Sequence, residues 1–155
     1  MYSKILVAVD DSETSRHALK QAIELARALS ASVRMVHVVD MSWLPIGPEV
    51  AIDTGALSAA RRGVGEEVIA VARDTVREAG FEAEDVLIET ETPIQHVAEV
   101  IAKEASRWGA DLLVLGTHGR RGFQHLMLGS VAEKMARLSP RPLLLIPSSE
   151  DSPSA

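Results

Sequence analysis

The chain has 155 residues, 46% of them hydrophobic and 25% charged, which is typical of one soluble globular domain. Its formal charge of −6 disfavours nucleic acids and anionic membranes as partners, and the lack of cysteine excludes disulfides, thiolate metal ligands and thiol catalysis. The opening MYSKILVAVDDS reaches an acidic pair after one short apolar run, so it resembles neither a signal peptide nor a membrane span. We therefore expect a cytoplasmic protein.

Apolar runs and helical periodicity alternate along the first half of the chain. A strand is predicted at Ile5–Val9, and a helix over the segment that includes Ala18–Leu29. A second strand is predicted at Val33–Val39 and a second helix over Leu57–Ala79, with Gly80 suited to the position just past the helix end. The residues at helical spacing in this second helix are Leu57, Arg61, Val64, Val68, Val71, Ala72, Thr75 and Ala79.

The third predicted helix has a distinct start signal. It follows a strand predicted at Asp85–Glu89, and the segment Thr92–Gln95 offers a capping threonine, a proline at the first helical position and a glutamine that closes a capping box. Its apolar stripe runs from Ile94 to Trp108, and Gly109 ends it.

The rest of the chain repeats the alternation and fixes the fold class. A strand is predicted at Asp111–Gly116, a helix at Ser130–Leu138 and a last strand at Pro142–Pro147. Strands that alternate with helices form right-handed βαβ units, and continuously apolar strands are covered on both faces. The predicted fold is α/β: one three-layer α/β/α sandwich over residues 1–147 with a five-stranded parallel sheet, followed by a polar, disordered tail at 148–155.

The carboxyl edge of this sheet is the predicted ligand site. In open α/β sheets, ligands bind beyond the strand ends where the strand order reverses. A 3-2-1-4-5 order places the reversal between the first and fourth strands, with Asp10 and Gly116 facing each other across a crevice. The long connection from Asp40 to Ala56 leaves the same edge, and two interpretations stay open: a flap beside the ligand, or a variable insertion with no role.

Glycines gather in the connection after the fourth strand. Their spacing is G-x2-G-x9-G-S, formed by Gly116, Gly119, Gly129 and Ser130. It is neither a Walker A loop, since Leu128 stands where the lysine belongs, nor a dinucleotide fingerprint. Gly129 and Ser130 at a helix N-terminus favour an anion, and Gly119 allows a phosphate to approach the backbone. The alternative is structural: Ser130 and Glu133 match a capping box, in which Ser130 only caps its helix.

With these motifs the sequence strongly resembles the universal stress protein family. The resemblance runs from KILVAVDDS through MVHVVD to LLVLGTHGRRG and LGSVAEKMARLSPRPLLLIP, and so covers nearly the whole chain. It implies the 3-2-1-4-5 sandwich, a homodimer that pairs around the fifth strand, and the G-x2-G-x9-G-[S/T] motif of nucleotide-binding members. One departure is Asp11, where family members often have glycine.

The resemblance also implies roles for individual residues. It places the phosphates on Gly119, Gly129, Ser130 and Val131. From the residues of the glycine stretch alone, Arg120 is expected to add positive charge nearby. The resemblance places the ribose near Gly116 and Asp10, and makes Asp10 a residue that approaches a phosphate-bound Mg²⁺. The base is expected beside Ala8 and Val9, with adenine paired to the main chain of Val38.

Three functional hypotheses follow. The first is an ATP-binding stress-response sensor or regulator with at most slow hydrolysis, because no general base or arginine finger is evident. The second is a slow ATPase or a self-phosphorylating enzyme that uses Ser130 or a nearby threonine. The third is a dimeric interaction module whose pocket stays empty. The sequence does not decide among ATP, AMP and other adenine nucleotides as the ligand.

The histidines and Ser12 have structural interpretations. No pair of histidines has the H-x3-H spacing of a metal site, and His37 is interpreted as a packed core residue. Ser12 is interpreted as a helix cap or a neighbour of the ligand.

Overall fold

The computed structural model describes residues 1–42, 53–92, 94–118 and 128–148. Its strands are β1 (Lys4–Ala8), β2 (Ser32–Val39), β3 (Glu84–Glu89), β4 (Leu112–Gly116) and β5 (Leu143–Ile146). Its helices are α1 (Glu13–Leu29), α2 (Thr54–Glu78), α3 (Val97–Trp108) and α4 (Ser130–Leu138). The strands pair in parallel in the order β3-β2-β1-β4-β5, which confirms the predicted α/β sandwich and its topology.

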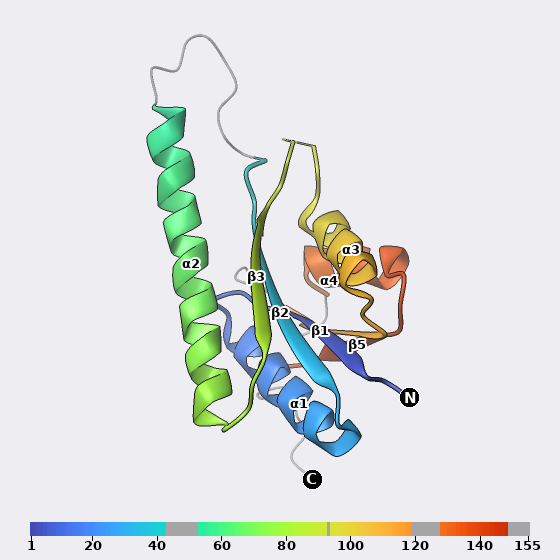
Figure 1. Cartoon of the computed structure of the whole chain (residues 1–155). Coiled ribbons are helices and arrows are strands. Elements are labelled where there is room, and N and C mark those ends of the chain that lie inside the picture. Colours follow the sequence, from blue (N-terminus) through green and yellow to red (C-terminus); the bar gives the residue numbers. More distant parts are fainter. Residues whose placement is uncertain (43–52, 93, 119–127, 149–155) are drawn as a thin grey trace.

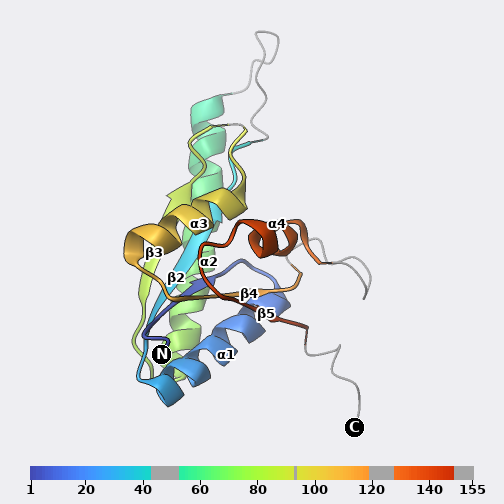
Figure 2. The same cartoon turned by 90° about the vertical axis from the view of Figure 1, so that its right-hand side faces the viewer.

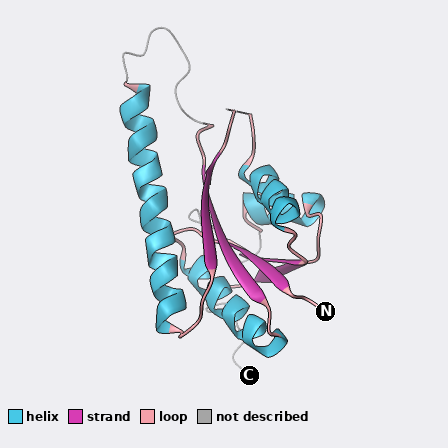
Figure 3. Ribbon diagram, in the orientation of Figure 1, coloured by secondary structure: helices cyan, strands magenta, loops and turns pink. Residues whose placement is uncertain are grey.

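The sheet lies between two helical layers, as Figures 1, 2 and 3 show. α1 and α2 cover one face, where alternate residues such as Ile5, Val7 and Met35 enter one core cluster. α3 and α4 cover the other face, where Leu6 and Val36 enter a second cluster. Because the central strands are buried on both faces, their sequences are continuously apolar instead of alternating. Within the described ranges, no helix combines the length and apolar character needed to cross a membrane.

The predicted start of the third helix is wrong by several residues. α3 begins at Val97, and its N-cap residue His96 makes no capping hydrogen bond through its side chain. The predicted capping residues form a turn instead: the Gln95 N–H donates to the Thr92 carbonyl at 3.2 Å, and the Gln95 side chain accepts from the Glu91 N–H at 2.7 Å. Ile94, predicted to join the apolar stripe, is consequently 83% exposed. The predicted stop at Gly109 is confirmed by its left-handed backbone.

The face that α2 turns to the sheet matches the predicted one in part, since Val68 and Ala72 belong to both. Val64 and Val71 are 46% and 50% exposed, and the buried residues are Gly65, Val68, Ile69, Ala72 and Val76. Gly65 belongs to this face because a Cβ there would lie 2.7 Å from Val39 Cγ2 and 3.0 Å from Leu87 Cδ1. A glycine in the helix therefore lets α2 approach β2 and β3 closely. The prediction for Gly80 is confirmed, since it follows the cap residue Ala79 with φ of 62°.

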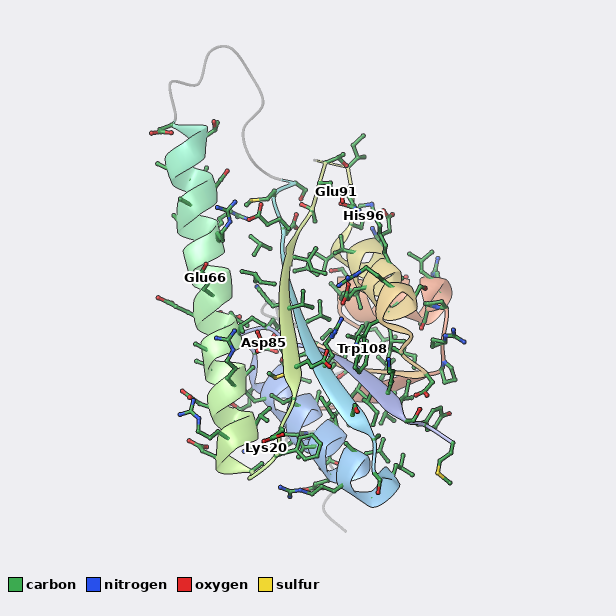
Figure 4. The ribbon with its side chains drawn as sticks, in the orientation of Figure 1. Lys20, Glu66, Asp85, Glu91, His96 and Trp108 are labelled. Carbon is green, nitrogen blue, oxygen red and sulfur yellow. The ribbon has the colours of Figure 1, made fainter. Side chains whose placement is uncertain are left out.

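Ion pairs join a helix of each layer to the sheet. On the α2 side, Arg73 donates to both carboxylate oxygens of Asp85, at 2.8 and 2.6 Å; Figure 4 labels Asp85. On the α3 side, the buried Glu104 accepts from Arg34 at 2.8 Å and from Arg107 at 2.7 Å. Burial raises the pKa of Glu104, but these hydrogen bonds outweigh it and the pKa lies below its usual value. Trp108, also labelled in Figure 4, stacks under Arg34 at 4.8 Å.

Gly63 and Gly65, two of the three glycines of α2, give a matched test of its packing. Gly63→Ala should raise the free energy of unfolding by up to about 1 kcal/mol, because nothing lies within 4 Å of a Cβ at Gly63 and alanine favours the helix. Gly65→Ala has the same helix propensity gain but forces a methyl group into Val39, and should lower stability by roughly 1–3 kcal/mol. Urea denaturation of both variants measures the difference. Equal effects at the two positions would contradict the close contact.

Candidate functional site

The end of β1 is turned away from the sheet by the first turn of α1. The Asp10 N–H donates to Ser15 Oγ at 2.8 Å, and Ser15 N–H donates to Ser12 Oγ at 3.1 Å. Ser12 is thereby the N-cap of α1, as one of its two interpretations predicted. The Ser12 N–H in turn donates to Asp10 Oδ1 at 2.8 Å. These bonds hold the half-buried Asp10 carboxylate at the carboxyl edge of the sheet.

Gly116 brings the end of β4 against the same turn of α1. A Cβ on Gly116 would lie 2.7 Å from Thr14 Cγ2 and 3.2 Å from the Thr14 carbonyl carbon. The buried Thr14 therefore occupies the space that a side chain at Gly116 would need. β1 and β4 are neighbours with the strand order reversing between them, so Asp10 and Gly116 do lie on either side of the reversal.

α4 begins beside the end of β4, and among the described residues no side chain caps it. The Gly129 N–H donates to the Thr117 carbonyl at 2.7 Å, and Gly129 is the N-cap with φ −62° and ψ 156°. Ser130 is the exposed first residue of the helix, so the capping-box interpretation of Ser130 is wrong. Glu133, its supposed partner, pairs with Arg137 at 3.0 Å instead. The first N–H groups of a helix have no partner within the helix, and such groups are able to bind an anion.

His118 carries an unsatisfied polar atom at the same edge. Its Nδ1 lies 2.9 Å from Thr117 Oγ1. Its Nε2 is buried and has no hydrogen-bond partner among the described residues. Such an atom costs free energy unless a further polar group pairs with it. The observation fits a polar ligand at the site.

The remaining predicted site residues divide into those the structure describes and those it does not. Ala8 is the last residue of the central strand β1 and Val9 follows it, while Val38 is the last residue but one of the neighbouring strand β2. Val131 follows Ser130 in α4. Gly119 and Arg120 fall outside the described residues, as does the stretch 43–52 of the long connection after β2. Their roles therefore remain predictions, and so does the disorder of the tail, described only as far as Ser148.

Sequence reasoning missed three residues that shape this edge: Thr14, Ser15 and His37. Thr14 and Ser15 are polar residues buried in the first turn of α1. Their position two and three residues after the capping Ser12 was the feature of the sequence by which they could have been found. His37 was predicted to be packed in the core. It is half-buried instead, and its Nδ1 bonds the Val9 carbonyl at 2.7 Å. No sequence pattern indicates that contact, because its partner is 28 residues away.

The contact between Gly116 and Thr14 gives a double-mutant test. Gly116→Ala should lower the free energy of unfolding by roughly 1–3 kcal/mol, because the new methyl group meets Thr14. Combining it with Thr14→Ser, which removes Cγ2, should recover part of that loss as a coupling of about 0.5–3 kcal/mol. Chemical denaturation of both single variants and the double variant measures it. Strict additivity of the two changes would show that the residues do not share this space.

Comparison with known proteins bears on the whole chain. The model of the universal stress protein family matches residues 1–147. Universal stress protein YxiE of Bacillus subtilis is 30% identical, covering 94% of this chain and 99% of its own length. A crystal structure from Burkholderia pseudomallei of the same family has a TM-score of 0.75 and 37% identity, covering 94% of this chain and 96% of that one.

A third similar structure was solved with a ligand. The universal stress protein from Archaeoglobus fulgidus in complex with dAMP has a TM-score of 0.63 and 27% identity, covering 94% of this chain and 98% of that one. Fold, strand order and sequence match thus agree over nearly the whole length. The chain belongs to the universal stress protein family.

Proposed function

We propose that this protein binds an adenine nucleotide at the carboxyl edge of its sheet and acts as a nucleotide-dependent regulator. The observation that carries the proposal is the N-terminus of α4, which begins at Gly129 and Ser130 and which no side chain of the described residues caps. Its N–H groups, the helix dipole and the exposed Ser130 hydroxyl suit a phosphate. The dAMP complex of the Archaeoglobus relative supports adenine as the base.

The two sides of the crevice take different parts of the nucleotide in this proposal. Gly129, Ser130 and Val131 hold the phosphates, with Gly119 and Arg120 from the preceding connection. Asp10 and Gly116 border the ribose, while Ala8, Val9 and the Val38 main chain border the base. The buried Nε2 of His118 leaves one further polar atom at this edge for a ligand. ATP is the proposed physiological ligand, and AMP is the simplest probe of the same subsites.

A magnesium ion is proposed to accompany a triphosphate. Asp10 Oδ1 accepts the Ser12 N–H at 2.8 Å, which leaves the second carboxylate oxygen to face a cation. Among the described residues, no three His, Asp or Glu side chains gather to hold a metal by themselves. Mg²⁺ is commonly held by one or two carboxylates together with substrate phosphates, which fits a single Asp10. The ion would neutralise phosphate charge next to Asp10 and the exposed Asp11.

Regulation, with at most slow hydrolysis, is the proposed use of the bound nucleotide. Fast phosphoryl transfer requires a group that positions the attacking water and a cation that stabilises the transition state. Ser130 is the exposed first residue of α4. Among the described residues, no general base is seen to pair with its hydroxyl. We further propose a cytoplasmic homodimer, since β5 is the sheet edge and Leu144 on it is 37% exposed.

The phosphate subsite is tested by titrating AMP calorimetrically into the wild-type protein and Ser130→Ala. The variant should bind about tenfold or more weakly, since a hydrogen bond to a charged group contributes roughly 1.5–3 kcal/mol. Ser106→Ala, on the exposed side of α3, is the matched control and should bind as the wild type does. Equal affinity for all three proteins would remove Ser130 from the site. An absence of AMP and ATP binding by the wild type would refute the proposal.

The dimer is tested by changing the edge strand. Leu144→Lys places a charge on the exposed side chain of β5, and charges on edge strands oppose pairing. Sedimentation velocity should find a dimeric wild type and a monomeric variant at the same micromolar concentration. Leu138→Lys in α4, whose side chain is also exposed, shows whether any added charge has this effect. A wild type that stays monomeric at high concentration would exclude the dimer.

A further inference from the structure

The hydrogen bonds between β1 and β2 end before β2 does, because β1 stops at Ala8 while β2 continues to Val39. The Val9 N–H still donates to the Val36 carbonyl at 2.9 Å, and this is the last backbone bond between the two strands among the described residues. In a continuing parallel ladder the Val9 carbonyl would accept from the N–H two residues further along β2, at Val38. It accepts instead from the ring of His37, at 2.7 Å.

The peptide groups of Val38 point to the side of β2 on which β1 lies, beyond the end of β1. The Val39 carbonyl accepts from the Thr90 N–H at 3.1 Å, so Val39 turns its peptide groups toward β3. Neighbouring residues of a strand present their peptide groups to opposite sides, and Val36 is already bonded to β1. The N–H and C=O of Val38 therefore point toward β1, past the last bond of the ladder.

His37 is held in place from the helical layer. Its side chain lies on the α1–α2 face of the sheet, where a Cβ on Gly65 of α2 would lie 3.3 Å from His37 Cδ2. Because a carbonyl oxygen can only accept a hydrogen bond, His37 Nδ1 is protonated and its N–H donates to the Val9 carbonyl. The bond draws the Val9 carbonyl out of the sheet plane toward α2, while the Asp10 N–H is drawn away by Ser15.

We propose that His37 is a positioning residue for base recognition, which keeps the Val38 peptide edge open by holding the Val9 carbonyl. The inference rests on the adenine-nucleotide site proposed above and adds to it the residue that exposes the base contact. Adenine presents an amino donor beside a ring-nitrogen acceptor, and one N–H and C=O pair from a strand residue matches that edge. His37 itself touches no ligand in this proposal.

The test separates base binding from phosphate and ribose binding. AMP and ribose 5-phosphate are titrated by NMR into wild type, His37→Leu and His37→Asn. The wild type should bind AMP more tightly than ribose 5-phosphate. His37→Leu lacks the hydrogen-bond donor, so the ratio of these two affinities should fall roughly tenfold, which is the size of one hydrogen bond. Its affinity for ribose 5-phosphate should stay within about twofold. His37→Asn places an amide N–H near the position of Nδ1 and should restore most of the preference.

The outcomes distinguish this inference from the function on which it rests. A wild type that binds neither probe removes the nucleotide site, and His37 with it. A wild type that prefers AMP together with an unchanged preference in His37→Leu overturns the role of His37 alone. Equal losses for both probes would show that His37 supports the fold generally, which also contradicts base positioning.

Hydrogen exchange gives a second readout that needs no ligand. The Val38 amide should exchange faster than the Val36 amide in the free wild type, because it lies past the last bond of the ladder. In His37→Leu the released Val9 carbonyl should pair with it and slow its exchange. A Val38 amide with the same exchange rate in both proteins would contradict the proposal.

Discussion

The hydrogen bond between the Asp10 N–H and Ser15 Oγ is the contact on which the edge of this sheet depends. It directs the chain out of β1 and into α1 within a few residues. The same turn places the Asp10 carboxylate against the Ser12 N–H and brings Thr14 against Gly116. It also ends the pairing of β1 with β2 one residue past β1. The ends of β1 and β4 are thus both held by the first turn of α1.

Three glycines at or near this edge serve three different physical purposes. Gly65 brings α2 close to β2, where His37 and Val39 would meet any Cβ. Gly116 leaves room for Thr14, so its lack of a side chain is explained by packing within the protein. Gly129 begins α4, and no side chain of the described residues caps the helix there. Of the three, only Gly129 belongs to the proposed nucleotide site through its own backbone.

Much of the fold could be predicted from the sequence because its central strands are buried on both faces. Such strands read as unbroken apolar runs, and Gly80 and Gly109 mark helix ends that require a left-handed backbone. The start of α3 could not be predicted, since Gln95 satisfies the Glu91 N–H in a turn and not the helix. The buried face of α2 was predicted only in part: Val68 and Ala72 are buried, but helical spacing of apolar residues gives no weight to Gly65.

The candidate site was predicted in part. The position of Gly129 and Ser130 at the start of α4 is confirmed, whereas the capping role of Ser130 is not. The contacts of Thr14 and His37 join residues distant in the chain, and no local pattern contains them. Residues implied only by family resemblance, such as Gly119 and Arg120, remain predictions.

The most direct test of a nucleotide site at the β1–β4 reversal is an amide chemical-shift map with and without AMP. On adding AMP, the largest changes in amide chemical shift should occur at Asp10, Val38, Gly116 and Ser130. The amides at the opposite edge, around Arg34 and Trp108, should stay unchanged. Shifts centred on that opposite edge, or a spectrum unaffected by saturating AMP, would contradict the proposed nucleotide site.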